Sequence, residues 1–119
     1  MKPENKTMII NFDNIAEETF VGFKGGHGEL LTRNYVDGNC KIMKSTLSPG
    51  AASGLHTHTG DSEIVYIVSG TATFHCDGLT ETATAGQVHY CPEGHSHYME
   101  NNTDTDLCYI AIVPRHEVK

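Results

Sequence analysis

The sequence lacks several features that mark large classes of protein. It contains no run of about 18 apolar residues, the length that predicts a membrane-spanning helix, so we expect no membrane span. Its first seven residues, MKPENKT, are too polar for the apolar region of a signal peptide, which favours a cytoplasmic location. Basic residues are few, with 8 Lys and Arg against 15 Asp and Glu and a formal net charge of −7. A surface of that sign repels polyanions, so we expect neither a nucleic acid partner nor an anionic membrane.

Several catalytic and metal-binding signatures are also missing. The four cysteines are scattered and form no C-x-x-C pair, which argues against a thioredoxin-type site or a zinc ribbon. In a reducing cytosol they are expected to be free thiols. No G-x-S-x-G is present, and no cysteine is marked as a nucleophile by its neighbours, so a serine or cysteine hydrolase is poorly supported. The 119 residues are also too few for a metal-dependent (β/α)8 barrel, which takes about 250 residues.

What the sequence does contain is a series of short apolar or alternating runs separated by turn residues. This pattern predicts an all-β sandwich or small barrel. Only one helical turn is expected, in which Asp13 and Asn14 cap residues 15–18. The sequence contains no linker or low-complexity tract, so we expect one domain over residues 1–119. The core of the barrel is expected at residues 40–113. Residues 1–28 are expected to form an N-terminal segment that is irregular, or that packs on the barrel or on a partner subunit. The expected strands are 29–35, 40–47, 55–57, 63–68, 71–76, 81–85, 88–91, 98–100 and 107–113.

Two of these strands, Ile64–Val68 and Tyr109–Val113, are apolar at consecutive positions. Since side chains alternate between faces along a strand, both faces of these strands require burial. The outer face of a lone small barrel meets water, so either the N-terminal segment or a second subunit must cover it. We favour a homodimer, because dimers are the commonest assembly.

The strongest local signal is His56-Thr57-His58 followed by Glu63. Positions i and i+2 of a strand point to the same side, so both imidazoles can reach one point. The turn at residues 59–62 can return the Glu63 carboxylate to that side, and far downstream His97 opens another strand. A single histidine is more often a surface or core residue than a ligand. Three neutral imidazoles and one carboxylate, however, suit a divalent transition metal.

The spacing around these residues follows two longer patterns. The first is G-x5-H-x-H-x4-E-x6-G from Gly50 to Gly70, and the second is G-x5-P-x-G-x2-H-x3-N from Gly86 to Asn101. Both resemble the signature motifs of the cupin superfamily, with the short inter-motif segment of small microbial cupins. The motifs cover about half of the chain, and the flanking strands fit the same fold.

The resemblance implies a single-domain jelly-roll β-barrel with a metal ion inside one end. It implies that His56, His58, Glu63 and His97 bind one divalent transition metal ion per chain, which could be manganese, iron, nickel or zinc. Gln87 departs from the pattern, because many relatives carry Asp at this position. That difference affects a turn contact and not a ligand.

The resemblance does not choose a reaction, because cupins include dioxygenases, isomerases, epimerases, lyases, decarboxylases and non-catalytic binders. The complete ligand set favours a metalloenzyme that acts on a small oxygen-rich or carboxylate-bearing metabolite. The alternative is a non-catalytic module that binds a sugar or carboxylate. A proton-transfer group near the metal would indicate the enzyme, and apolar walls around the four ligands alone would indicate the binding module.

Three residues beyond the ligands are candidates for a catalytic role. His95 forms a same-side pair with His97 and lies either at the pocket mouth or in a solvated loop. Tyr66 and Tyr98 could act as acid–base groups, although a strand tyrosine more often serves packing. His89 lies on a strand, and the sequence does not reveal which of its alternate side chains face the cavity.

The glycine-rich run 22–28 lacks the GK[ST] and helix of a phosphate-binding loop, so we expect a flexible loop.

Overall fold

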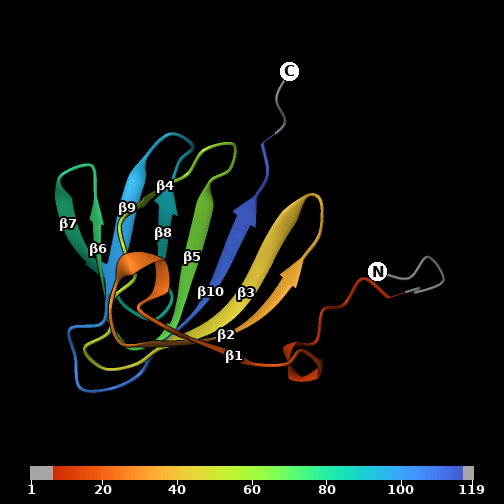
Figure 1. The fold of residues 1–119 in the computed structure, drawn as a ribbon, viewed down its shortest axis with the longest axis horizontal. Coiled ribbons are helices and arrows are strands. Elements are labelled where there is room, and N and C mark those ends of the chain that lie inside the picture. The colour runs from red at the N-terminus through yellow and green to blue at the C-terminus, as the bar shows by residue number, and fades with distance from the viewer. Residues whose placement is uncertain (1–6, 117–119) are drawn as a thin grey trace.

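The computed structural model describes residues 7–116, which form two antiparallel sheets that face each other as a jelly-roll barrel (Figure 1). The six-stranded sheet has the order β1-β2-β3-β10-β5-β8, and the four-stranded sheet has the order β4-β9-β6-β7. The strands of the first sheet are β1 (Glu18–Val21), β2 (Glu29–Val36), β3 (Cys40–Leu47), β5 (Glu63–Ser69), β8 (Val88–Cys91) and β10 (Leu107–Pro114). Those of the second are β4 (His56–Thr57), β6 (Ala72–Cys76), β7 (Leu79–Ala83) and β9 (Ser96–Glu100).

The expected all-β fold is confirmed, and two of the expected strands have the bounds of β3 and β8. The expected helical turn is displaced. The chain instead forms a 3₁₀ helix, η1 (Phe12–Asn14), because the Asn11 side chain caps it by accepting the Asp13 amide at 3.0 Å. The sequence also gave no sign of β1, because all four of its residues are exposed and show no alternation of burial. β1 is held by its pairing with β2.

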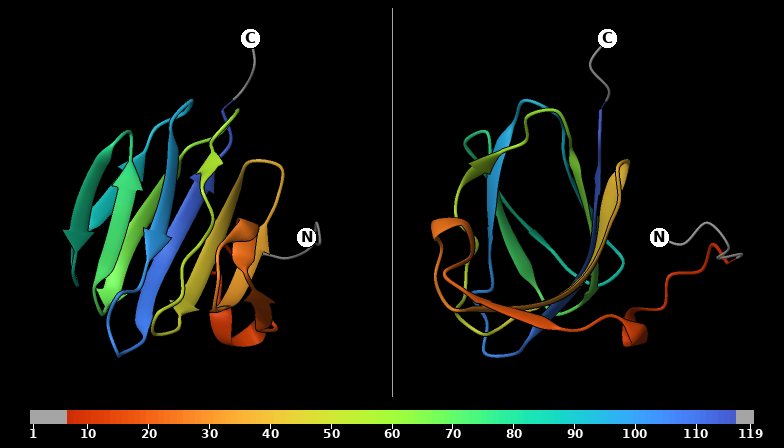
Figure 2. Two further views of the ribbon diagram at one scale, coloured as in Figure 1. Left: turned by 60° about the vertical axis from the view of Figure 1, so that its left-hand side comes forward. Right: turned by 45° about the vertical axis from the view of Figure 1, so that its right-hand side comes forward.

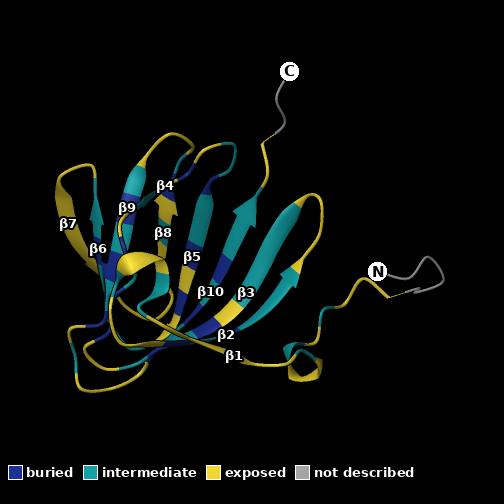
Figure 3. Cartoon of the chain, viewed as in Figure 1, coloured by how far each residue is buried: buried dark blue, intermediate teal, exposed yellow. Residues whose placement is uncertain are grey.

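The inner face of the six-stranded sheet is closed at the bottom by leucines. Leu30 and Leu107 each lie beside Leu47 across neighbouring strands, and all three are at most 4 % exposed. We refer to them as the floor. On the opposite sheet, Phe74 and Met99 are buried in the same core. Figure 2 shows the two sheets facing each other, and Figure 3 shows buried stretches on both of them.

Two rows of side chains lie above the floor and are important for the site. The hydroxyl row consists of Thr32, Ser45 and Tyr109, which are cross-strand neighbours on β2, β3 and β10 and are all buried. The rim row lies four residues higher, or about 13 Å along the strands. It contains Lys41 opposite Val113, and Glu63 at the start of β5. The rim-row residues are only partly buried, so burial increases from the rim to the floor.

The run 22–28 is not the flexible loop that its glycines suggested. It contains the 3₁₀ helix η2 (Phe23–Gly25) and is hydrogen-bonded to residues 52–54. The Gly54 amide donates to the Phe23 carbonyl at 2.9 Å. A Cβ atom on Gly54 would lie only 1.7 Å from the Lys24 carbonyl oxygen, so this close approach requires glycine. The run therefore forms a packed wall beside the strand that carries His56.

The outer face of β5 and β8 is apolar and exposed. Tyr66 and Val68 on β5 are each 45 % exposed, and Val88 and Tyr90 on β8 are each 55 % exposed. We refer to these four residues as the outer patch. β1 pairs with β2 at the far edge of the sheet and does not cover the outer patch. A second subunit on this face stays a prediction.

All four cysteines are free, and none of the helices among residues 7–116 has the length and apolar character needed to cross a membrane.

Candidate metal centre

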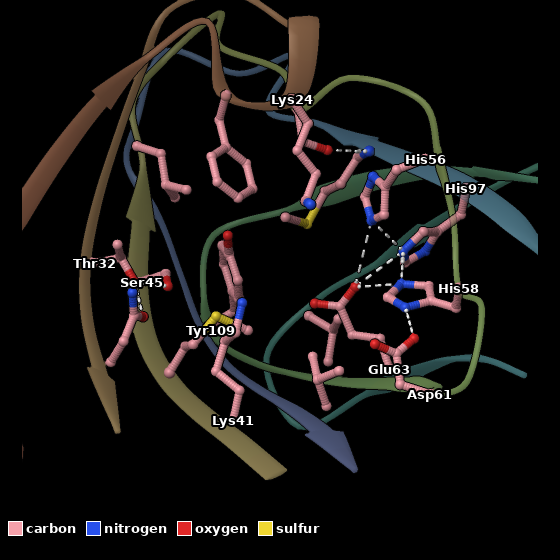
Figure 4. A pocket seen from close by; sticks show the side chains of 18 of the residues that line it. Lys24, Thr32, Lys41, Ser45, His56, His58, Asp61, Glu63, His97 and Tyr109 are labelled. Atoms are coloured by element: carbon pink, nitrogen blue, oxygen red, sulfur yellow. Dashed lines mark hydrogen bonds and ion pairs between the residues drawn. The ribbon is translucent and has the colours of Figure 1, made fainter. Parts of the chain in front are cut away.

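The residues of the two sequence motifs meet between the sheets. His56 on β4 and His97 on β9 are direct cross-strand partners, and His58 follows β4 at the next same-side position. Glu63 comes from the opposite sheet, where it begins β5. The turn between them is held by a hydrogen bond from the Gly60 amide to Glu93 and by the pairing of Asp61 with His58. Two sheets thus present one group of side chains to the same point (Figure 4).

The spacing of the four donor atoms fits one shared ion. The His97 Nε2 lies 3.2 Å from the His56 Nε2 and 3.1 Å from the His58 Nε2. The Glu63 Oε1 lies 3.1 Å from the His58 Nε2 and 3.0 Å from the His97 Nε2. Donor atoms that sit about 2.1 Å from a common centre and at right angles are about 3.0 Å apart. All four donor atoms lie within 4.8 Å of one another.

The other nitrogen of each imidazole has a partner of its own. The His56 Nδ1 lies 2.8 Å from the Gly54 carbonyl, and the His58 Nδ1 lies 2.8 Å from Asp61. Both partners only accept, so in each ring Nδ1 carries the proton and Nε2 of the neutral ring carries a lone pair. Three such lone pairs close to one carboxylate repel one another unless a cation binds among them. The donor set therefore fits a divalent transition metal.

His97 is oriented by a fourth histidine. The His89 Nε2 lies 3.0 Å from the His97 Nδ1, and the His89 ring stacks on Phe74 with 4.0 Å between centroids. Burial, together with the charge of His97, lowers the pKa of His89 to about 4. A neutral His89 can accept the Nδ1 proton of His97, which leaves the His97 Nε2 free for a metal. The structure thus shows which side chains of β8 face the interior of the barrel, and His89 is one of them.

The charge of the cluster is concentrated on Glu63. Burial raises the pKa of the Glu63 carboxyl, but the neighbouring imidazoles of His56, His58 and His97 outweigh burial and hold the pKa well below its usual value. The hydrogen bond to Glu63 raises the pKa of His58, and its partner Asp61 adds to this effect against the opposing effect of burial. Glu63 is therefore a carboxylate at neutral pH and an effective ligand for a cation.

A cavity of about 310 Å³ opens from the cluster into the barrel. Figure 4 shows the four cluster residues on one side of it, Thr32 and Ser45 on the other, and Tyr109 between them. Burial raises the pKa of the Tyr109 phenol, and the nearby charge of Glu63 adds to this shift, so the hydroxyl stays neutral. The other lining residues come from both sheets and from the 22–28 run, and about half of them are apolar: Phe20, Phe23, Leu30, Met43, Val65, Phe74, Met99 and Val113. The rest are polar or charged, among them Lys24, Lys41 and Asp61.

The three candidate catalytic residues lie outside the residues that line this cavity. Tyr66 belongs to the outer patch. Tyr98 stacks on His75 with 4.3 Å between ring centroids and lines a separate pocket. His95 is 44 % exposed at its side chain and pairs with Asp77. Gln87 makes the turn contact expected of it, since its Oε1 accepts the Thr84 amide at 2.8 Å.

Sequence reasoning missed the hydroxyl row and Lys41 as parts of the site. Tyr109 was expected only as part of a buried strand, and no motif surrounds Thr32 or Ser45. The inward alternation along β3 and β10 was readable, but the register that aligns these strands with β5 was not. The cavity lining follows from that register.

Comparison with known proteins agrees with this geometry. Residues 43–113 match the model of the cupin domain family. A curated Thermotoga maritima protein, named an oxalate-binding protein, is 33% identical over 116 residues, which cover 92% of this chain and 96% of that one. A crystal structure of a predicted oxalate decarboxylase from the same organism has a TM-score of 0.84 at 31% identity and covers 91% of this chain and 99% of that one.

A third relative is much longer than this chain. The oxalate decarboxylase of Bacillus subtilis is 39% identical over 85 residues, which are 62% of this chain but only 22% of that protein. The family match spans more than half of the chain, and its two histidine-bearing segments are those that converge between the sheets. The chain therefore belongs to the cupin domain family.

Proposed function

We propose that this protein binds a small chelating carboxylate, of the oxalate class, through a divalent metal ion held by His56, His58, Glu63 and His97. The observation that carries the proposal is that the three Nε2 atoms and the Glu63 carboxylate open onto a cavity between the two sheets. A bound divalent ion would supply open coordination positions and a net charge of about +1 for ligand oxygens. The relative named as an oxalate-binding protein supports this ligand class.

The protein's own residues suit this role. Lys41 in the rim row adds a second positive charge at the end of the cavity where the cluster lies. Phe74 and Val65 make the walls apolar, and removal of water strengthens the attraction between a cation and an anionic ligand. The cavity volume is at the lower end of the range for small-molecule sites, which is about 300–1,000 Å³.

The second candidate is a metal-dependent enzyme of the dioxygenase, isomerase, epimerase, lyase or decarboxylase type. Its specific support is the similarity to the oxalate decarboxylase of Bacillus subtilis. Decarboxylation requires a group that delivers a proton to the product. The lining carboxylic acids are Glu63, which belongs to the cluster, and Asp61, which is held on His58. Neither is a free acid, and this favours the binding function.

Calorimetric titration of metal-loaded protein with oxalate tests the proposal. We expect saturable binding at one ligand per chain that disappears when the metal is removed with a chelator. Incubation with oxalate and analysis for formate and carbon dioxide separates the two candidates, because a binding protein returns the oxalate intact. Protein with one metal ion per chain that binds neither oxalate nor a related chelating acid would overturn the proposal.

A further inference from the structure

The backbone of Lys24, in the wall beside the metal centre, has an unfavourable conformation. Among the described residues, the non-glycine residues with positive φ are Asp77, at 54°, and Lys24, at 53°. Asp77 opens the Asp-Gly turn between β6 and β7, where a positive φ is usual. Lys24 instead lies inside the 3₁₀ segment η2, and lysine adopts this left-handed region far less readily than glycine or asparagine. A residue that keeps such a conformation points to a role for its side chain.

The wall that carries Lys24 is fixed to the segment that orients a metal ligand. The Gly54 amide donates to the Phe23 carbonyl at 2.9 Å, and the Gly54 carbonyl accepts from the His56 Nδ1 at 2.8 Å. The backbones of Lys24 and Gly54 pack so closely that no side chain fits between them. The Lys24 side chain therefore starts from a fixed position relative to His56.

This side chain extends from the wall into the cavity, as Figure 4 shows. Its Nζ lies 5.3 Å from the centre of the Phe23 ring. Among the described residues, no carboxylate forms an ion pair with Lys24. The carboxylates that line the cavity are Glu63, which belongs to the cluster, and Asp61, which is held on His58. Lys24 thus brings a positive charge to the cavity that an anionic group of a ligand can pair with.

The cavity is also larger than oxalate requires. A molecule of liquid water takes about 30 Å³, so a cavity of about 310 Å³ keeps space beside an oxalate bound at the metal. Lys41, the other lysine of the lining, lies in the rim row with Glu63, on a different wall from Lys24. Resting on the proposed function, we propose that the ligand is a dicarboxylate longer than oxalate, with one carboxylate at the metal and the second bound by the Lys24 ammonium group. Lys24 is then a residue that determines specificity.

Three acids that share an α-hydroxycarboxylate and differ only at the far end test this inference. They are malate with a carboxylate, its β-amide malamate with a neutral group of the same shape, and 2-hydroxybutyrate with a methyl group. In calorimetric titrations of the manganese-loaded protein, we expect malate to bind about five- to tenfold more tightly than either of the other two. Added salt should reduce this advantage, because Lys24 is exposed.

Two substitutions of Lys24 separate binding from a structural role. Lys24→Met should abolish the advantage of malate over malamate, and it should weaken malate more than oxalate. Lys44→Met is the matched control, since it removes the same charge from an exposed position opposite Ile110, and it should keep the advantage. Lys24→Asn places a residue that tolerates positive φ at this position. It should also lose the advantage, and its midpoint of urea unfolding should not fall below that of the wild type.

The outcomes distinguish this inference from the function on which it rests. If oxalate binds but malate has no advantage over malamate, the inference is overturned and the proposed function stands. The inference also fails if the advantage survives in Lys24→Met, because the second carboxylate then binds elsewhere, or if Lys44→Met abolishes it. A lower unfolding midpoint for Lys24→Asn would assign Lys24 a structural role and overturn the inference. If the metal-loaded protein binds none of these acids and no oxalate, the proposed function fails and the inference fails with it.

Discussion

The two ends of the cavity are assembled from the chain in different ways. At the metal end, His56, His58 and Glu63 come from one segment of eight residues, and only His97 comes from a distant strand. At the hydroxyl row, Thr32, Ser45 and Tyr109 come from three strands and are neighbours only through pairing register. A local pattern of residues can therefore reveal the first end, whereas only the assembled sheet reveals the second.

The two ends should also differ in the property that is lost when a side chain is removed. The metal end depends on a precise set of lone pairs, so substitutions there should remove the ion while leaving most of the core intact. The floor and hydroxyl row lie in the packed interior, so substitutions there should act first on stability. The following predictions test this difference, from the largest expected effect to the smallest.

His97→Ala should reduce the bound metal from one ion per chain to nearly none, because it removes a ligand that contacts the other three. The measurement is elemental analysis of protein purified without chelators. His95→Ala is the matched control, because His95 is exposed and pairs with Asp77 outside the cavity. Unchanged metal content in His97→Ala would contradict the metal centre.

Leu107→Ala at the floor should reduce the free energy of unfolding by about 2–5 kcal/mol, since it leaves a hole in a fully buried position. Urea unfolding monitored by circular dichroism gives this value. The metal content of the folded variant should stay at one ion per chain. A variant that loses the ion while retaining its stability would show that the two ends are not separable.

His89→Ala should weaken metal binding about 10- to 100-fold, because it removes the acceptor that orients His97. Competition with a chelating dye measures this affinity. His75→Ala is the control, since His75 bonds to Glu100 and stacks on Tyr98 away from the cavity. Equal affinity in wild type and His89→Ala would mean that His97 needs no such partner.

Thr32→Val should lower the free energy of unfolding by about 1 kcal/mol, because it removes, at nearly constant volume, the hydroxyl that hydrogen-bonds to both Ser45 and Asn34. Thr46→Val is the control on the same sheet, where the hydroxyl makes only a 3.6 Å contact with the Cys108 sulfur. Metal content should not change in either variant. A larger loss of stability for Thr46→Val than for Thr32→Val would contradict the importance of the two Thr32 hydrogen bonds.

The outer patch should affect assembly and leave both ends of the cavity unchanged. We expect the protein to be a homodimer by light scattering at micromolar concentration, and Tyr66→Lys together with Val88→Lys to shift it toward the monomer. Metal content should be unaffected, because these residues face away from the cavity. A wild-type monomer under these conditions would contradict the dimer.

Much of the fold could be predicted, for reasons that are local. The alternating runs at 40–47 and 88–91 gave strands with the observed bounds, since both are bordered by turn residues on each side. β1 could not be predicted, because its four exposed residues lack alternation and depend on pairing with β2. The run 22–28 was misjudged for a similar reason, because its glycines permit close packing on residues 52–54 and do not serve flexibility.

The sequence by itself determined the metal end, because a same-side H-x-H, a glutamate after one turn and a histidine after a proline turn specify ligand chemistry at short range. Only the tertiary structure decided that His89 faces His97 and that Tyr109 lies beside Ser45 and Thr32. These contacts follow from strand register, and register is fixed jointly by the burial of whole strands. No short segment of the chain contains that information.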